Sequence, residues 1–435
     1  MSGIPLLAPR DLARTFARRG DAVITGADFL CEVQALAAVL PQARHVANLC
    51  QDRVRFAVGF AAALVRGQVT LLPPSEAPGV LDSVLSGYDD CYCLTDGDLP
   101  VAAREYRYPQ HLPAGDVIMP EIPANQIAAV LYTSGSTGAP QPHPRSWGLL
   151  VSSADSAGRE IGADRLPGAS LIGTVPHQHS YGLESLIMLA FRHALVLHAE
   201  RPFYPQDIAA SLQRAPAPRI LVTTPVHLRV LLAEAASLPQ ADLVLSATAP
   251  LDEALACAAE EGFGARLYEI YGCSEVGQLA ARRTMHGLEW RCLDGIALRQ
   301  QAGATFATGA RIAAPTRLGD IIELRDSRHF RLLGRDSDLV NIAGKRHSLA
   351  ALAALLCSLE GVHDAVFMMR EGQGRPIAFA VAPGMDGSAL LAALRGRVDP
   401  AFLPRRLHLV ERLPRNALGK ITQAALALLA ESARR

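Results

Sequence analysis

The sequence lacks an excess of charge of either sign, because its 435 residues include 42 acidic and 42 basic side chains. A balanced chain offers no basic field for nucleic acid and no strong attraction to an anionic membrane surface. No internal repeat or low-complexity tract is evident. Nucleic-acid binding and peripheral membrane binding are therefore not expected.

A disulfide framework and a cysteine-rich metal site are also lacking. The eight cysteines are scattered, and none forms a Cys-x-x-Cys pair of the zinc or thioredoxin kind. We interpret them as reduced thiols and expect a cytoplasmic protein.

Long hydrophobic runs are missing as well. The N-terminal residues have no basic region followed by an apolar stretch of signal-peptide length. The longest apolar stretches, such as residues 56–65, fall short of the ~20 residues that span a bilayer. These stretches predict buried helices, and no membrane span is expected.

Half of the residues are hydrophobic, which at this length allows two or three domains with sizeable cores. Strand-like runs alternate with helix-like segments such as residues 28–40, and this alternation predicts an α/β fold with mainly parallel sheets sandwiched by helices. Beyond Gly334 a helix at 346–360 and strands at 365–369 and 377–381 predict a small α+β domain. The earlier strand-like runs are residues 68–72, 127–131, 171–175, 194–197, 219–223 and 243–246.

The most informative segment is residues 131–140, Leu-Tyr-Thr-Ser-Gly-Ser-Thr-Gly-Ala-Pro, directly after one of these strands. Gly135 and Gly138 permit a close approach of the backbone to an anion, and the hydroxyls of Ser136 and Thr137 add donors. Such a loop predicts a phosphate site at the carboxyl end of a strand. Taken alone, a cluster of serine, threonine and glycine is more often a surface turn.

Four further motifs follow in order: Tyr-Gly-Cys-Ser-Glu at 271–275, Leu-Gly-Asp at 318–320, Gly-Arg-Asp-Ser-Asp at 334–338 and Leu-Pro-Arg-Asn-Ala-Leu-Gly-Lys at 413–420. Together the five motifs, in this order over residues 123–422, resemble the core of the adenylate-forming superfamily. That superfamily includes acyl- and aryl-CoA synthetases, acyl-carrier-protein synthetases, peptide-synthetase adenylation domains and luciferase.

The resemblance implies an adenylation core at 1–334 and a small mobile C-terminal domain at 335–435 that carries the catalytic lysine. The hinge position of the family is occupied by Ser337, between Asp336 and Asp338. Because an acidic residue or a lysine is usual there, the identity of the hinge residue stays open.

The implied reaction joins a carboxylate to the α-phosphate of ATP, with Mg²⁺, and releases pyrophosphate. Bringing two anions together requires positive charge, and Lys420 matches the lysine that supplies it. Glu275 matches the magnesium-binding glutamate, since Mg²⁺ prefers oxygen ligands, and Thr137 would add a second contact. Cys273 has no visible general base around it, and we interpret it as structural.

The resemblance assigns further residues to the nucleotide. Tyr271 would stack on adenine, Ser274 would contact the α-phosphate, and Asp320 would accept hydrogen bonds from both ribose hydroxyls. The full predicted ATP set is Thr133, Ser134, Gly135, Ser136, Thr137, Gly138, Ala247, Thr248, Tyr271, Gly272, Ser274, Asp320, Arg335 and Arg346.

The segment Pro-His-Gln-His-Ser-Tyr-Gly at 176–182 resembles the family element that gates the carboxylate pocket. This places His179 at the gate, with a catalytic role, and adds Tyr181 and Ser246 to the predicted substrate pocket. Two alternatives stay open: His177 and His179 as zinc ligands, although no matching ligand set lies nearby in sequence, or a packed or solvated pair.

Two departures from the family pattern are visible. Gln141 stands where the phosphate loop normally has a lysine, and Arg145 or His143 would have to take over its charge. Residues 247–250 read Ala-Thr-Ala-Pro instead of Gly-Gly-Ala-Pro, which makes the predicted adenine loop less permissive. These departures resemble the stand-alone ligases of aryl-polyene and xanthomonadin-type pigment pathways.

The leading hypothesis is therefore a ligase that activates a hydroxybenzoate-like aryl acid and transfers it to an acyl carrier protein. Two alternatives remain: an acyl- or aryl-CoA synthetase that uses free CoA, and a non-catalytic homologue that binds nucleotide or acyl-adenylate. Net charge does not decide the acceptor, because a carrier protein and CoA both need only a local cationic patch. Arg405, Arg406, Arg412 and Arg415 are candidates for that patch.

Overall fold

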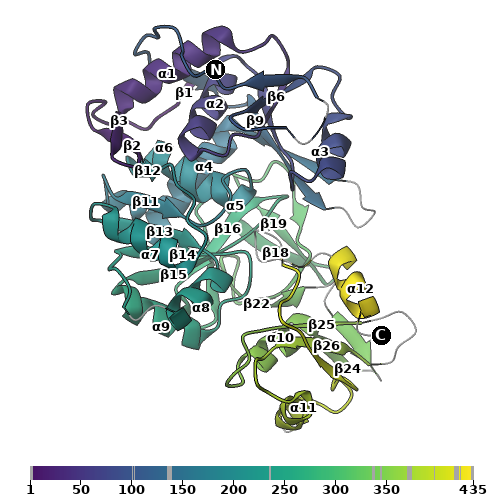
Figure 1. The fold of residues 1–435 in the computed structure, drawn as a ribbon. Helices are drawn as coiled ribbons and strands as arrows, with labels where there is room; N and C mark the ends of the chain where they lie inside the picture. The colour runs from purple at the N-terminus through teal and green to yellow at the C-terminus, as the bar shows by residue number, and fades with distance from the viewer. Residues whose placement is uncertain are drawn as a thin grey trace.

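The computed structural model has two large sheets with helices around and between them, followed by a smaller C-terminal block (Figure 1). It describes residues 3–99, 101, 103–134, 140–234, 237–335, 339–342, 345–369, 375–395, 397–415, 421 and 423–432. Only the backbone is described for residues 133, 134, 335, 339, 341, 345–347, 423 and 424.

The smaller of the two large sheets has six strands in the order β10-β9-β5-β4-β6-β7. All neighbours are parallel except β10, which is antiparallel to β9. The predicted phosphate loop thus joins the two strands of a hairpin. The strands are β4 His45–Asn48, β5 Val69–Leu72, β6 Cys91–Thr95, β7 Glu105–Arg107, β9 Ile127–Ser134 and β10 Pro140–Ser146.

Strand β10 holds Pro140, Pro142 and Pro144 at every second position and lies at the edge of this sheet. Alternate residues of a strand direct their N–H groups to opposite sides. Prolines at this spacing remove donors on one side of the strand, as an edge strand permits. They also leave that edge a poor template for pairing with another chain.

The larger sheet has eleven strands in the order β21-β22-β17-β16-β15-β14-β13-β11-β12-β2-β3. Strands β15 to β2 are parallel, and antiparallel strands extend the sheet at both ends. The strands are β2 Thr15–Arg19, β3 Ala22–Thr25, β11 Ser170–Gly173, β12 Val196–His198, β13 Arg219–Thr223, β14 Leu243–Ser246, β15 Arg266–Cys273, β16 Gly277–Arg282, β17 Glu289–Cys292, β21 Asp320–Leu324 and β22 His329–Arg335.

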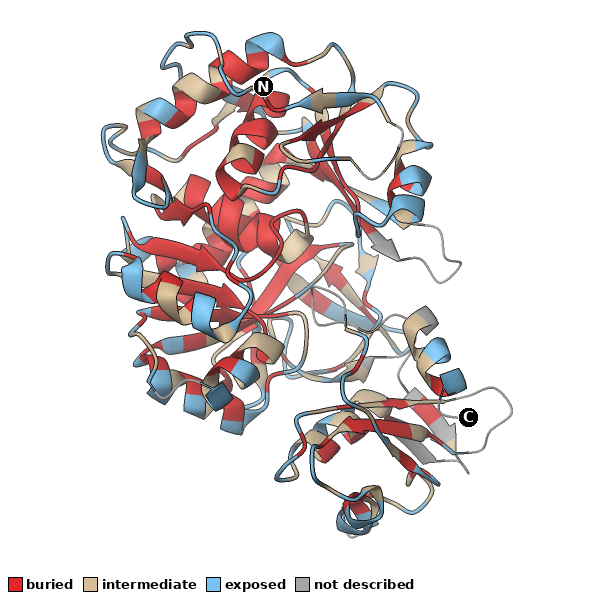
Figure 2. Cartoon of the chain, viewed as in Figure 1, coloured by how far each residue is buried: buried red, intermediate tan, exposed pale blue. Residues whose placement is uncertain are grey.

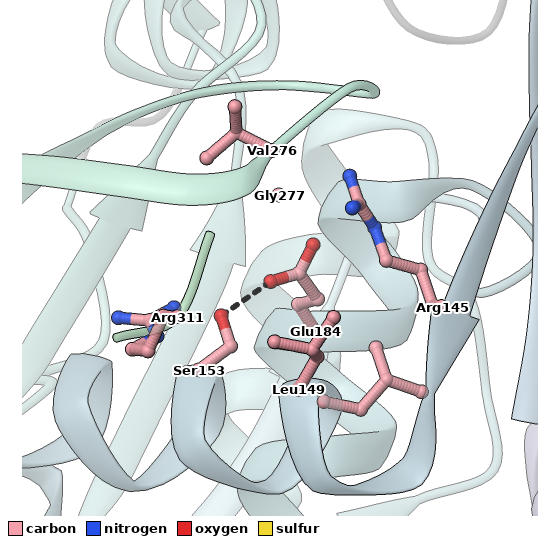
Figure 3. A pocket seen from close by; sticks show the side chains of 8 residues that line it. Arg145, Leu149, Ser153, Glu184, Val276, Gly277 and Arg311 are labelled. Carbon is pink, nitrogen blue, oxygen red and sulfur yellow. Dashed lines mark hydrogen bonds between the residues drawn. The ribbon is translucent and has the colours of Figure 1, made fainter. Parts of the chain in front are cut away.

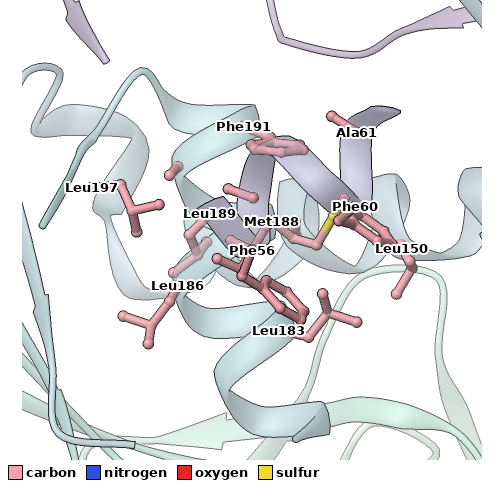
Figure 4. Close-up of a cluster of buried hydrophobic side chains, with 14 of the residues drawn as sticks. Phe56, Phe60, Ala61, Leu150, Leu183, Leu186, Met188, Leu189, Phe191 and Leu197 are labelled. Atoms are coloured by element: carbon pink, nitrogen blue, oxygen red, sulfur yellow. The ribbon is translucent and has the colours of Figure 1, made fainter. Parts of the chain in front are cut away.

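A layer of helices packs between the two sheets and contains the largest core (Figure 2). Phe56 and Phe60 of α2 meet Leu150 of α4, Met188 and Phe191 there (Figure 4), and each is fully buried or nearly so. The helices of this layer are α1 Gly26–Val39, α2 Arg53–Val65, α4 Trp147–Ile161, the π-helical η2 Leu183–Met188 and α6 Leu189–His193.

Helices also cover the outer faces of both sheets. The core on the outer face of the larger sheet includes residues of α7 Pro205–Arg214, α8 Pro225–Glu234 and α9 Glu253–Phe263, and α3 Pro78–Leu85 packs on the smaller sheet. The prediction of mainly parallel sheets sandwiched by helices is confirmed. The antiparallel extension from β16 to β21 was not predicted.

Local sequence accounts for the helix ends. Thr25 and Asp28 form a capping box at the start of α1, and Ser146 and Asp252 cap α4 and α9. Gly162 ends α4 with φ 78°, a left-handed conformation that glycine adopts without strain.

The C-terminal block has a core of its own, built from α10, α11, β25 and β26. The expected helix at 346–360 begins later than predicted, because residues 345–348 pair with β23 and Ser348 caps α10. The elements are β23 Leu339–Ile342, β24 Lys345–Ser348, α10 Leu349–Cys357, β25 Asp364–Met368, β26 Ile377–Val381, α11 Gly387–Arg395, β27 Leu407–Leu409 and α12 Gln423–Ser432.

Short elements complete the described chain. None of its helices has the length and apolar character needed to cross a membrane. The short elements are β1 Gly3–Pro5, β8 Glu121–Pro123, η1 Ala163–Arg165, α5 Ser180–Gly182, η3 Thr284–His286, β18 Ala297–Gln301, β19 Ala304–Thr308 and β20 Thr316–Arg317.

Candidate active site

Residues of three separate motifs meet beside the antiparallel end of the larger sheet. The Tyr271 hydroxyl donates to Oδ2 of Asp320 at 2.5 Å, across 49 residues of sequence. Asp320 in turn lies opposite Arg335 in the register of β21 and β22. Tyr271 also packs against Trp290 and Phe330, with ring centroids 5.7 and 5.9 Å away. The fold therefore brings together Tyr271, Asp320 and the backbone of Arg335, all three predicted to contact the nucleotide.

The turn that holds Ser274 and Glu275 joins β15 to β16. Glu275 is exposed, whereas Ser274 is half-buried. Gly272 precedes them in β15, and a Cβ there would lie only 2.5 Å from the carbonyl oxygen of Gly277. Only glycine permits this close approach of the two backbones. Cys273 ends β15 directly before this turn, and burial raises the pKa of its thiol to about 12, as expected of a structural cysteine.

Arg145 approaches this turn from β10. Its Nη1 donates to the carbonyl oxygen of Glu275 at 3.0 Å and its Nη2 to the carbonyl oxygen of Ser274. Its guanidinium is thus directed at the turn. His143 is half-buried, and burial lowers its pKa. The Glu275 carboxylate opposes this shift, and the charge of Arg145 adds to it. Both residues are candidates to replace the charge of the lysine that Gln141 replaces.

The predicted adenine loop begins where β14 ends. Ser246 is fully buried, and its Oγ has no hydrogen-bond partner within the part of the chain that the structure describes. Ala247 is buried beside it. Thr248 has φ 80°, a left-handed conformation that is rare for a β-branched residue. The family glycine that Thr248 replaces would adopt this conformation freely.

Replacing Thr248 with glycine is expected to raise the free energy of unfolding by about 1 kcal/mol, because it removes the strain of the left-handed β-branched residue. Urea denaturation of the native protein and of Thr248→Gly checks this. Thr248→Ala is the matched control, since its Cβ retains the strain. A gain in stability from alanine equal to that from glycine would contradict the explanation.

The two histidines of the predicted gate occupy different environments. The His177 ring is fully buried, packs 4.5 Å from Phe56 and places Nε2 2.9 Å from the carbonyl oxygen of Cys50. His179 is half-buried and immediately precedes α5. His177 therefore fits the packed alternative. No group of three or more metal-ligating side chains lies among the residues that are described.

Tyr181, the other residue predicted near the gate, packs against the main core. Its hydroxyl is buried and has no hydrogen-bond partner in the described ranges. Burial raises the pKa of this phenol. A buried donor of this kind is costly unless a ligand group satisfies it, which is compatible with a place in a substrate pocket.

Burial lowers the pKa of His177 to about 3 and those of His198 and His227 to about 4. At pH values between the ordinary histidine pKa of 6.5 and these lowered pKa values, the unfolded state therefore binds more protons than the folded state. We expect the free energy of unfolding to fall as the pH drops through this window.

His177→Gln, whose amide keeps a donor near Cys50, is expected to flatten this pH dependence by up to about 1.4 kcal/mol per pH unit. Urea denaturation at several pH values from neutral to mildly acidic measures how the free energy of unfolding changes with pH in the native protein and in the variant. The same pH dependence in the variant would show that His177 does not contribute to the change of unfolding free energy with pH.

The sequence did not identify Glu184, a buried carboxylate in the π-helical segment η2. Its Oε2 accepts from Ser153 Oγ at 2.7 Å and from the Gln278 N–H at 3.2 Å, and its Oε1 accepts from Ser180 Oγ at 3.0 Å. Figure 3 shows it between Arg145 and Arg311, at a small cavity behind the Glu275 turn. The available signal was an acidic residue within an otherwise apolar run.

Several predicted site residues are described by their backbone alone or lie outside the described residues. Thr133 and Ser134 end β9, and Arg346 lies in β24, with only their backbones described. The residues that lie outside the described ranges are Gly135, Ser136, Thr137, Gly138 and Lys420, together with the predicted hinge 336–338.

The donors that are present fit a nucleotide and a divalent cation. Tyr271 lies beside Asp320, whose carboxylate can accept hydrogen bonds from ribose hydroxyls. The Glu275 carboxylate is exposed, and Mg²⁺ in nucleotide sites is usually held by one or two carboxylates together with phosphate oxygens.

Comparison with known proteins assigns the family. A family model described as AMP-binding enzyme matches residues 83–303, more than half of the chain. The chain belongs to this family. The prediction of an adenylate-forming enzyme of the acid–thiol ligase class is thereby confirmed at the level of the family.

A curated relative among AMP-binding enzymes is 4-coumarate–CoA ligase from Rhodobacter capsulatus, 29% identical over 67% of this chain and 74% of its own length. The fold is similar to ATP-bound MatB from Rhodopseudomonas palustris, with a TM-score of 0.82, 18% identity and coverage of 98% and 97%. It is also similar to o-succinylbenzoate CoA synthetase from Bacillus subtilis with ATP and magnesium, with a TM-score of 0.78, 19% identity and coverage of 94% and 95%. These two structures support the predicted fold class.

Proposed function

We propose that this AMP-binding enzyme activates an aryl carboxylic acid with ATP and transfers the acyl group to a phosphopantetheine thiol of an acyl carrier protein. In the first step a carboxylate oxygen attacks the α-phosphorus and pyrophosphate leaves. In the second step the thiol sulfur attacks the acyl carbon, and AMP leaves as the thioester forms.

The observation that carries this proposal is the hydrogen bond between Tyr271 and Asp320, with Arg335 directly across from Asp320. Three residues assigned to one nucleotide by separate motifs would meet by chance only rarely. An aromatic acid is supported by the curated relative, since the 4-coumarate in its name carries an aromatic ring.

In this proposal Mg²⁺, when bound, neutralises phosphate charge, and Glu275 with Thr137 would hold it. Tyr271, Gly272, Ala247 and Thr248 would bind the adenine. The other side chains of the predicted set would orient the ribose and phosphates, and His179, Tyr181 and Ser246 would line the acid pocket. Lys420 would stabilise the charge that develops at the α-phosphate.

We also propose that residues 1–334 and 335–435 act as two domains, the second of which moves between the two steps. The separate C-terminal core supports this division. Free thiols at all eight cysteines support a cytoplasmic location.

A negatively charged acceptor, either a carrier protein or CoA, is supported by local charge. Arg405, Arg406 and Arg412 are exposed, whereas Arg415 is engaged by Asp364 at 2.6 Å. Carrier proteins present acidic surfaces, to which exposed arginines are complementary. Free CoA is the second candidate, since the curated relative is named a CoA ligase.

The test is acid-dependent exchange between ATP and pyrophosphate across hydroxybenzoates, cinnamates and fatty acids, followed by thioester formation with holo carrier protein or CoA. Exchange with an aryl acid and faster transfer to the carrier protein are expected. Arg405→Glu with Arg406→Glu should slow carrier transfer about tenfold and leave exchange unchanged. ATP binding without exchange for any acid would instead favour the non-catalytic alternative.

A further inference from the structure

Strand β10 carries a row of polar side chains whose burial increases along the strand. Gln141, His143 and Arg145 alternate with the prolines, so they share one face of the strand. Gln141 is exposed, His143 is half-buried, and Arg145 is 7% exposed. The row therefore starts where the predicted phosphate loop ends, and its last member, Arg145, contacts the turn that holds Ser274 and Glu275.

Arg145 carries a buried charge that is compensated by peptide carbonyls. Its Nε has no hydrogen-bond partner within the described part of the chain. Its two Nη atoms instead donate to the carbonyl oxygens of Ser274 and Glu275. A buried guanidinium is costly without such bonds, so the contact strongly favours this one conformation of the turn.

The orientation of these carbonyls fixes the opposite side of the turn. The C=O and N–H of a trans peptide unit point in opposite directions. Because the Ser274 carbonyl faces Arg145, the N–H of Glu275 points away from the Arg145 guanidinium. The Glu275 residue itself is exposed. That N–H donates to no group in the described ranges.

Two further contacts support the same conformation from inside the protein. The Val276 N–H donates to the Cys273 carbonyl at 3.2 Å, and Gly277 has φ 87°. Glu184 accepts from the following N–H, that of Gln278, and a Cβ on Gly277 would lie 3.1 Å from its Oε1 (Figure 3). The turn is thus held by buried groups on one side, while Gly272 and Glu275 are exposed.

We propose that Arg145 is a positioning residue for the reaction: it fixes the Ser274–Glu275 peptide so that the N–H and carboxylate of Glu275 face the triphosphate and its Mg²⁺. The inference rests on the proposed function. It assigns Arg145 a role different from that of a phosphate ligand, because its guanidinium acts through the turn. Through its two hydrogen bonds, Arg145 connects strand β10 of the phosphate-loop hairpin directly to the turn that carries Glu275.

The test compares Arg145→Met and Arg145→Lys with the native protein. Arg145→Met is expected to weaken the affinity for Mg·ATP about tenfold, since Glu275 is no longer held in place. Pyrophosphate release should slow by about 10²-fold, while KM for the acid stays within about twofold. Arg145→Lys keeps the charge without the two-pronged geometry and should recover only part of both losses.

Calorimetric titration with Mg·ATP is the primary measurement because it requires no turnover, and thermal denaturation shows whether each variant is folded. Arg331→Met is the matched control: this side chain is 58% exposed on β22 and should leave affinity and rate unchanged. A folded Arg145→Met with native affinity and rate would overturn the proposal. If that variant does not fold, native behaviour of Arg145→Lys would overturn it.

The same titration separates this inference from the proposed function. A native protein that binds Mg·ATP but activates no acid would refute the ligase activity. The difference in affinity between the native protein and Arg145→Met would still decide whether Arg145 positions Glu275.

Discussion

Lys420→Ala is expected to reduce the rate of acyl-adenylate formation by about 10²–10³-fold or more. The reaction brings a carboxylate toward the α-phosphate of ATP, and negative charge grows on the phosphate oxygens as pyrophosphate departs. An ammonium placed at that point stabilises the transition state more than the bound substrates. Its loss should therefore lower kcat, while the affinity for ATP changes much less.

Single-turnover pyrophosphate release with an aryl acid measures this effect. Lys420→Arg keeps a charge of different shape and should restore only part of the rate. Arg397→Ala, at an exposed position of the C-terminal block, is the control and should behave as the native protein. A native rate of pyrophosphate release in Lys420→Ala would show that Lys420 does not have the assigned role.

The second large effect is expected at Asp320. Its carboxylate is assigned to both ribose hydroxyls and lies 2.5 Å from the Tyr271 hydroxyl. Hydrogen bonds to a charged group contribute about 1.5–3 kcal/mol each, so Asp320→Ala should weaken ATP binding about 10²-fold. The Tyr271 hydroxyl also loses its acceptor in this variant, which adds to the cost.

Calorimetric titration with ATP and with the 2′-deoxy nucleotide tests this assignment. The native protein should bind ATP more tightly than the deoxy analogue, and Asp320→Ala should bind the two equally. Glu323→Ala is the matched control, because its carboxylate is 59% exposed on the same strand. A variant that still distinguishes the two nucleotides would show that Asp320 does not contact the 2′-hydroxyl.

Much of the fold follows from local sequence. Residues 377–381 form a strand with the predicted bounds, and the predicted strand at 219–223 is β13. Short apolar runs between helical segments are sufficient evidence for buried parallel strands. The helix predicted from residue 346 was placed too early, because pairing of β24 with β23 outweighs the helical propensity of its residues.

The candidate site was predictable only in part. The motifs predict site roles for Tyr271, Asp320 and Glu275, but the partners of these residues are not visible in the sequence. Arg145 was considered as a phosphate ligand because it is the nearest cation to the loop. Its observed partners are two backbone carbonyls 129 and 130 residues away, which no local pattern predicts.

By itself, the sequence determined the family, the alternation of strands and helices, the caps of the helices and the order of the motifs. These depend on residue type and short spacings, which act through local sterics and hydrogen bonding. Tertiary structure alone decided that Tyr271 meets Asp320, that Arg145 holds the Glu275 turn and that Glu184 lies behind it. Such contacts depend on the order of strands in the sheets and on side-chain directions, which are set by packing over the whole chain.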